Sequence, residues 1–210
     1  MDNTPIKFLN SIISLNIGIL LFDDVELLDF AGPCEVFCIA NVVVAVDKSN
    51  VTPFRVFTIA DKSPTIRTRA CLRVLPDFGL DNCPNIDLLL VPGGPGVRRE
   101  MENEKLIDWI IRVAKLHRRV ASVCTGALLL GRAGLLKGRQ ATTHVSALDE
   151  LAQLCPDTIV VGKQRVVESG PILTAAGVSS GIDLGLYLVG YYLNGEIRRL
   201  VAERMEYGLP

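Results

Sequence analysis

The 210-residue sequence has little of several features that define common classes of protein. It contains two histidines, one tryptophan and no Cys-x-x-Cys pair, so a zinc site has little support. Lys and Arg together number 22 and Asp and Glu 23, and this near-neutral balance argues against nucleic-acid binding through a basic surface. Repeats and low-complexity tracts are also missing. Because 49% of the residues are hydrophobic, the chain has enough apolar material for a globular core, which excludes a disordered chain.

The N-terminal region lacks a strong signal for export or membrane insertion. An apolar run from Phe8 to Phe22 follows a single lysine, and four polar residues between positions 10 and 16 interrupt it. A signal peptide needs a more basic start and a small-residue cleavage site, and a membrane span needs about 20 apolar residues. We therefore expect residues 1–14 to be an extension and residues 15–210 to form one domain, with no membrane partner. A targeting role for the extension is the alternative.

The six cysteines are spread along a chain that is large enough not to need disulfides, at positions 34, 38, 71, 83, 124 and 155. This spacing favours free thiols, and a reducing cytoplasm is the compartment that fits them. The count alone leaves open whether they fill the core or include one reactive thiol.

Short apolar runs alternate with segments of helical periodicity, which predicts an α/β fold with a mostly parallel sheet covered by helices on both faces. The run Asp87–Val91 is apolar enough for a strand buried on both faces. Ser146 is a candidate N-cap for a helix over residues 147–154. The apolar residues from Ile182 to Leu200 recur at helical spacing, so we expect one long helix near the C-terminus.

Ligands of such sheets bind where the parallel strands end, and three loops are expected there. They are Asp23–Gly32, Pro92–Gly96 and Cys124–Gly126. Cys124 stands between a predicted strand and a predicted helix, in the position of a nucleophile elbow. The positive end of that helix should lower the pKa of the thiol. The alternative is a buried structural cysteine; the other five cysteines lack such a setting.

Two further features of these loops can take part in chemistry. The glycine loop lets its backbone approach a ligand closely, so the N–H groups of Gly94 and Thr125, beside Gly93, are candidates for an oxyanion hole; a tight turn is the alternative. Asp29 is a lone carboxylate among apolar residues and is a candidate general acid or base, or else a helix N-cap.

His144 follows another predicted strand and is a candidate for the same edge of the sheet. A hydrogen-bonded structural histidine is the alternative that we favour for it. Asp23, Asp24 and Glu26 lie near Asp29 in the sequence and are expected to be solvated.

The segment Cys124–His144, CTGALLLGRAGLLKGRQATTH, resembles the nucleophile segment of the ThiJ/PfpI superfamily, which has a flavodoxin-like, class I glutamine amidotransferase-like fold. It is similar more narrowly to the isonitrile hydratase branch and to the sensor domains of AraC-type transcription regulators. The segments 28–33, 91–94 and 174–183 support the resemblance, which covers residues 15–207.

The resemblance implies that Cys124 is the nucleophile, Asp29 the acidic residue, Thr125 the threonine after the nucleophile and Gly94 the oxyanion-loop glycine. It also implies a homodimer without a cofactor. Protease-like and glyoxalase-like members carry histidine where this chain has Thr125, which lowers the expectation of a peptidase. Relatives often carry tryptophan where this chain has Val145, so the pocket is expected to differ.

The function expected from these residues is cysteine-dependent hydration of isonitriles to N-substituted formamides, with a small-molecule substrate and no nucleic-acid partner. The first alternative is a sensor module that binds a small molecule without turnover. No helix-turn-helix module is seen before the sequence ends at Pro210, and such a module would be expected in a regulator. The second alternative is a redox-sensing protein, which requires an acidic thiol at Cys124.

Overall fold

The computed structural model describes residues 14–47, 52–61, 64–116 and 119–208, so nearly all of the predicted extension lies outside the described residues. The centre is a seven-stranded sheet in the order β10-β11-β7-β6-β1-β2-β5. Only β10 runs antiparallel to its neighbour, which confirms the predicted mostly parallel sheet. The bounds are β1 Leu15–Leu20, β2 Phe54–Ala60, β5 Phe78–Gly79, β6 Leu88–Val91, β7 Arg119–Val123, β10 Val166–Ser169 and β11 Ile172–Ala175.

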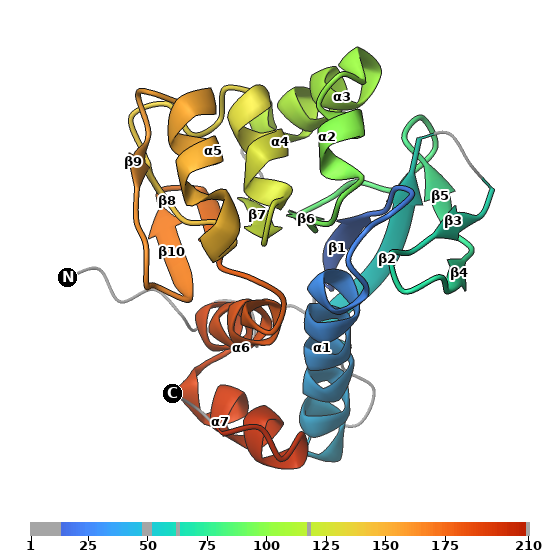
Figure 1. Ribbon diagram of the computed structural model, residues 1–210. Coiled ribbons are helices and arrows are strands. Elements are labelled where there is room, and N and C mark those ends of the chain that lie inside the picture. Colours follow the sequence, from blue (N-terminus) through green and yellow to red (C-terminus); the bar gives the residue numbers. More distant parts are fainter. Residues whose placement is uncertain (1–13, 48–51, 62–63, 117–118, 209–210) are drawn as a thin grey trace.

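Helices cover both faces of the sheet (Figure 1). One face carries α1 (Leu27–Asp47), α6 (Ser180–Tyr192) and α7 (Gly195–Arg204), and the other carries α2 (Val97–Glu100), α3 (Glu104–Lys115), α4 (Gly126–Arg132) and α5 (Leu148–Leu154). Two small strand pairs lie outside the main sheet: β3 (Ile66–Arg67) with β4 (Arg73–Val74), and β8 (Gln140–Ala141) with β9 (Ile159–Val160).

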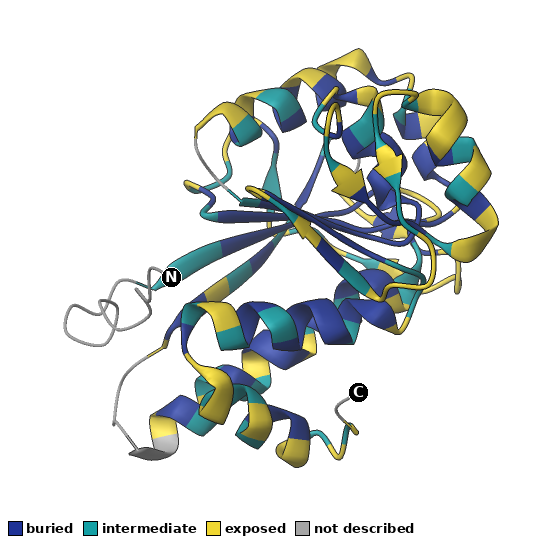
Figure 2. Cartoon of the chain, turned by 90° about the vertical axis from the view of Figure 1, so that its left-hand side faces the viewer, coloured by how far each residue is buried: buried dark blue, intermediate teal, exposed yellow. Residues whose placement is uncertain are grey.

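The core lies along the sheet, between the two helical layers, and Figure 2 shows the buried residues concentrated there. All four residues of β6 are buried, because helices exclude water from both faces of this central strand. This is why the strand reads as a continuous apolar run in the sequence instead of an alternating pattern. The same burial holds for the last four residues of β7 and for all of β11.

Helix α1 is long and apolar enough to cross a membrane by length and composition, with a mean hydropathy of 1.7 over Leu27–Ala45. Its residues Val36, Phe37 and Ala40 are nevertheless 0% exposed, and the helix packs against α6, α7 and β2. The apolar composition of α1 is thus explained by its place in the core.

The predicted long C-terminal helix is wrong. The chain leaves the helical conformation at Leu193, and α7 starts anew at Gly195. The Asn194 side chain accepts the Ile197 N–H at 2.8 Å and so caps the second helix. The apolar spacing continues across the break because both helices pack their apolar residues against the rest of the protein. The Asn194 cap, and not this spacing, determines where α7 begins.

Candidate active site

Three loops meet at the carboxyl ends of the parallel strands, as the sequence predicts. The Gly93 N–H, after β6, donates to Asp29 Oδ2 at 2.9 Å, which fixes the first turn of α1 against this loop. The Gly94 N–H donates to Thr125 Oγ1 at 3.0 Å, and the Glu26 N–H donates to the Gly93 carbonyl at 2.9 Å. The glycine loop after β6 therefore connects the loop after β1 to the loop after β7.

Cys124 occupies a strained turn between β7 and α4. Its φ is 58°, in the left-handed region that non-glycine residues seldom adopt. The Cys124 N–H lies within hydrogen-bond distance of the carbonyls of Ala175 (3.0 Å) and Ala176 (2.8 Å), and the Thr143 hydroxyl donates to the Cys124 carbonyl at 2.8 Å. These contacts hold the backbone of the elbow, and the residue is 7% exposed.

Asp29 faces the thiol of Cys124 from the first turn of α1. The residue is 0% exposed, and its Oδ1 has no hydrogen-bond partner within the described residues. Burial raises the pKa of this carboxyl from 3.8 to about 7, against the opposing effect of the Gly93 N–H. Asp29 is thus a carboxyl group poised to gain or lose a proton near neutral pH, and it is not a helix N-cap.

The thiol of Cys124 is less acidic than the sequence suggests. Burial, followed by the charge of Asp29, raises its pKa from 9.0 to about 12. The backbone N–H groups of Thr125 and Val178 interact with the sulfur and lower the pKa, but their effect is smaller. The Thr125 N–H at the start of α4 thus lowers the pKa as predicted, but burial and Asp29 outweigh it, so the predicted acidic thiol, which redox sensing needs, is not what this environment creates.

The predicted oxyanion hole also needs correction. The N–H groups of Gly93 and Gly94 are both used within the protein, by Asp29 and Thr125 respectively. The N–H groups that face the sulfur belong to Thr125 and Val178, and Val178 reaches this position with a φ of 43°. Gly93 is required by close packing instead, since a Cβ there would lie 2.6 Å from both the Thr125 nitrogen and its Oγ1.

His144 has a structural role in the local backbone. Its Nδ1 accepts the Ser146 N–H at 3.2 Å and lies 2.8 Å from Ser146 Oγ. The histidine thereby caps a short 3-10 helix, η1 (Val145–Ala147), and α5 begins only at Leu148, so the predicted Ser146 cap is wrong. His144 still borders the cavity beside Cys124.

A cavity of about 160 Å³ opens at the sulfur. Its wall includes Cys124, Thr125 and Val178, together with the charged residues Glu26, Arg69 and Arg98. Arg69 pairs with Glu26 at 2.8 Å, so the expectation that Glu26 is simply solvated is wrong.

Three residues of this cavity wall, Arg69, Arg98 and Val178, were not predicted from the sequence. The signal for Val178 was its place between a buried strand and the start of a helix, the same setting that drew attention to Cys124.

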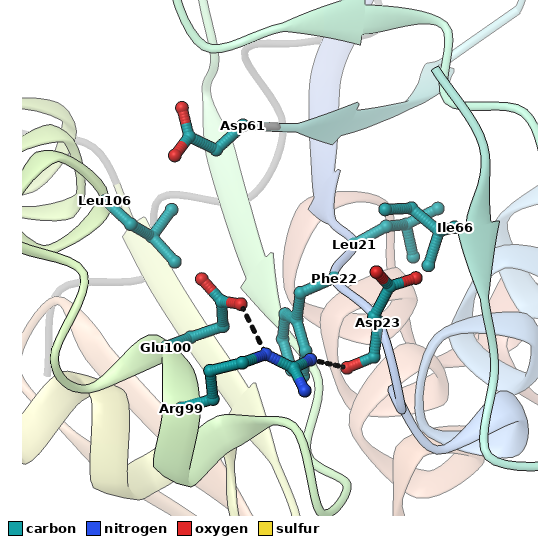
Figure 3. Close-up of a pocket in the computed structure, with 8 residues that line it drawn as sticks. All are labelled: Leu21, Phe22, Asp23, Asp61, Ile66, Arg99, Glu100 and Leu106. Atoms are coloured by element: carbon teal, nitrogen blue, oxygen red, sulfur yellow. Dashed lines mark hydrogen bonds and ion pairs between the residues drawn. The ribbon is translucent and has the colours of Figure 1, made fainter. Parts of the chain in front are cut away.

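A second cavity, of about 130 Å³, lies near the ends of β1 and β2 (Figure 3). Arg99 lies within it and contacts Glu100 and the Asp23 carbonyl, at 3.4 and 2.7 Å. Asp61 is held by Lys105 at 3.0 Å. Arg99, Glu100 and Asp61 are therefore all paired, Asp61 with a lysine outside the cavity wall, and the residues that line this cavity include no cysteine, serine or threonine.

All six cysteines are free thiols. Among the residues that the structure describes, no group of three or more His, Cys, Asp or Glu side chains is arranged to hold a metal ion. The chemistry that this edge of the sheet can support is nucleophilic attack by sulfur, with proton transfer to and from a carboxyl group.

Comparison with known proteins places this geometry in a family. Residues 16–190 match the model of the DJ-1/PfpI family. The chain is 36% identical over 195 residues to an isonitrile hydratase from Pseudomonas putida, covering 92% of this chain and 79% of the relative. A crystal structure of a ThiJ/PfpI family protein from Pseudomonas syringae is 25% identical, covers 100% of this chain and 82% of that chain, and superposes with a TM-score of 0.81.

Transcription regulators are also similar. The HTH-type transcriptional regulator GbdR from Pseudomonas aeruginosa is 28% identical over 91% of this chain, which spans 50% of the regulator's length. A crystal structure of an AraC family transcriptional regulator from Pseudomonas putida shares the fold, with a TM-score of 0.80 at 19% identity, and covers 91% of this chain and 99% of that chain. From the matched residues and the sheet that carries the cysteine elbow, we conclude that the chain belongs to the DJ-1/PfpI family.

Proposed function

We propose that the protein hydrates isonitriles to N-substituted formamides, with Cys124 as nucleophile and Asp29 as general acid and base. The observation that carries the proposal is a carboxyl group of pKa about 7 that faces a buried thiol at the wall of a small cavity. The 36% identity to an isonitrile hydratase supports the choice of reaction. No metal or other cofactor takes part in the proposed steps.

In the first step, the sulfur attacks the terminal carbon of the isonitrile. Since the pKa of the Cys124 thiol is about 12, little thiolate stands ready at neutral pH, and Asp29 has to accept the thiol proton as the S–C bond forms. The proton then passes from Asp29 to the former isonitrile carbon. The product is a thioimidate, Cys–S–CH=N–R, and Asp29 is again ionised.

In the second step, water attacks the thioimidate carbon. Asp29 accepts a proton from the water and passes it to the imine nitrogen, which gives a tetrahedral adduct that carries OH, NHR and the sulfur and leaves Asp29 ionised. The adduct collapses to the formamide as the S–C bond breaks, and the proton of the OH group returns to the sulfur through Asp29. The sum is one isonitrile and one water converted to one N-substituted formamide.

The N–H groups of Thr125 and Val178 favour negative charge on the sulfur. Sulfur is most negative as it attacks and as it leaves, so these two groups stabilise both transition states. Thr125 also holds the glycine loop through its hydroxyl, which accepts the Gly94 N–H. We propose that Gly93 and Gly94 act by positioning Asp29 and Thr125.

The test is incubation with cyclohexyl isocyanide, with N-cyclohexylformamide followed by mass spectrometry. Wild-type protein should form product, and the Cys124→Ser variant should form none above background. Cys38→Ser, which changes an exposed thiol on α1, is the matched control and should keep full activity. Full activity in Cys124→Ser, or no product from the wild type with a series of small isonitriles, would reject the proposal.

A ligand-sensing role without turnover is the second candidate, and the similarity to GbdR over 91% of this chain favours it. A sensor needs the cavity but not the proton transfer. A small molecule that raises the melting temperature by mass action and is recovered unchanged supports this role. A homodimer and a cytoplasmic location remain proposals from family resemblance, which light scattering and cell fractionation would test.

A further inference from the structure

A larger cavity, of about 350 Å³, adjoins the one at Cys124. His144 and Val178 line both cavities, so a molecule whose reactive end lies at the sulfur can extend past these two residues into the larger space. The volume is within the range of small-molecule sites in proteins. The proposed mechanism uses only the smaller cavity.

One part of the larger cavity is apolar. Leu148 and Val145 form this part of the wall, and Val145 is 76% exposed. An apolar group of a ligand that lies against these side chains would remove their surface from water, which favours binding. Carbon chains or rings on the substrate fit this wall.

The other part carries two hydroxyl groups that make no hydrogen bond within the described residues. Thr142 and Ser180 line the cavity and are each 1% exposed, and no hydrogen bond of their hydroxyl groups is found in the part of the chain that the structure describes. Neither oxygen is among the buried side-chain atoms that lack a partner, so both hydroxyl groups keep accessible surface at the cavity, where they can bond to a ligand or to ordered water.

Two cationic residues also border the cavity, and they differ in whether a carboxylate neutralises them. Arg165 is neutralised by Asp183, with Nε and Oδ2 2.5 Å apart. Lys163 pairs with no carboxylate among the described residues. It is held with a φ of 62°, in the left-handed region. Lys163 is thus an exposed cation of the cavity wall that no carboxylate among the described residues neutralises.

We propose that the larger cavity binds the nitrogen substituent of the substrate, and that this substituent is a short carbon chain ending in a carboxylate. The chain lies against Val145 and Leu148, and the carboxylate pairs with Lys163 and accepts hydrogen bonds from the hydroxyl groups of Thr142 and Ser180. This inference rests on the proposed function for the identity of the reactive end, but the cavity itself does not depend on it.

The kinetic test compares 4-isocyanobutanoate with 1-isocyano-4-methylpentane, a neutral substrate of matching shape. Wild-type protein should show a higher kcat/KM for the carboxylate, by about tenfold. Lys163→Gln should abolish this preference mainly through KM, and Lys163→Arg should retain part of it. Lys137→Gln is the matched control, since Lys137 is exposed and pairs with Asp157 away from the cavity.

The steric test is Val145→Trp, which should lower kcat/KM for 1-isocyano-4-methylpentane relative to methyl isocyanide. Leu75→Trp, at another exposed site, is the control and should leave this ratio unchanged. If Lys163→Gln keeps the carboxylate preference, or if the wild type has none, the proposed carboxylate site is wrong.

A binding measurement separates this inference from the proposed function. N-formyl-4-aminobutanoate, the hydration product of the carboxylate substrate, is titrated into wild-type and Lys163→Gln protein by calorimetry. Binding that weakens about tenfold in the variant supports the carboxylate site even if no isonitrile is turned over, in which case only the proposed function fails. Turnover of isonitriles without binding of this product or carboxylate preference rejects the inference and leaves the proposed function standing.

Discussion

The two edges of the central sheet are built in opposite ways. At the amino ends of the parallel strands, polar groups are matched in pairs. The Asn41 side chain accepts the Phe54 N–H at 3.0 Å and donates to the Phe54 carbonyl at 2.7 Å. Arg119 pairs with Glu168 at 2.6 Å and stacks on the Tyr191 ring at 3.9 Å from its centroid. These contacts tie helix α1 and helix α6 to the sheet.

At the carboxyl ends, beside the sulfur, the structure keeps features that are unfavourable for stability. Asp29 is a buried carboxyl group with an oxygen that has no partner within the described residues, and Cys124 and Val178 hold left-handed backbone conformations. Such features destabilise a fold, and they persist where the surrounding structure enforces them. The amino edge thus holds contacts that stabilise the fold, and we propose that the unfavourable features beside the sulfur are kept for reactivity.

The largest effect is expected at the carboxyl edge, from Asp29→Asn. Removing the general base should lower kcat/KM by about 10²–10⁴-fold. Because the pKa of Asp29 is about 7, wild-type kcat/KM should fall as the pH drops below about 7 and Asp29 becomes protonated. The measurement is initial rates of isonitrile hydration between pH 5 and 9. A pH profile that is flat through 7 would contradict the assignment of Asp29 as base.

The same substitution should stabilise the fold at alkaline pH. The pKa of Asp29 is higher in the folded chain (about 7) than the 3.8 of an unburied carboxyl, so its favourable contribution is complete below about pH 4 and is lost as the pH rises through 7. A rise from 3.8 to about 7 corresponds to about 4 kcal/mol at most. Urea unfolding of wild type and Asp29→Asn at pH 5 and 8 should show an advantage for the variant that grows with pH.

At the amino edge, a substitution should destabilise the fold and leave catalysis unchanged. Asn41→Ala leaves the backbone N–H and carbonyl of the buried Phe54 without their partner, which should cost about 1–3 kcal/mol. Since Asn41 is far from the sulfur in the fold, kcat/KM per folded molecule should stay the same. Val42→Ala, at the next and more exposed position of α1, should change the unfolding midpoint less. A loss of kcat/KM in Asn41→Ala would show that the two edges are not independent.

The smallest effect is expected from Tyr191→Leu. This substitution removes the ring that Arg119 stacks on and should cost about 0.5–1 kcal/mol in the free energy of unfolding. Tyr191→Phe keeps a ring at the same place and should be closer to wild type. Equal losses in the two variants would assign the effect to the hydroxyl group instead of the ring.

The fold was readable from the sequence because strands covered on both faces are nearly all apolar. The run ending at Val91 and the run ending at Val123 both became central strands. The break between α6 and α7 was not readable from periodicity, since Ile197 continues the apolar spacing of the preceding helix. The Asn194-Gly195 pair was the local signal, and a side-chain cap outweighed the longer pattern.

The site was readable in part. Cys124 and Asp29 could be placed at one edge because parallel strands end together. Their pKa values could not be predicted, since these depend on how completely distant segments exclude water from both groups. The use of the Gly94 N–H by Thr125 likewise depends on the register of two loops 31 residues apart. The order of the helices and strands could therefore be predicted from the sequence, whereas the pKa values and the contacts between loops could not.

The burial of Cys124 has a consequence for chemical labelling of this protein. Alkylating reagents react with thiolates, and they reach exposed sulfur first. Cys38 and Cys71 are exposed, whereas Cys124 is buried, and its burial together with the charge of Asp29 raises its pKa to about 12. A survey that ranked the six cysteines by their rate of reaction with iodoacetamide would therefore place the proposed nucleophile near the bottom, behind thiols that have no part in the chemistry.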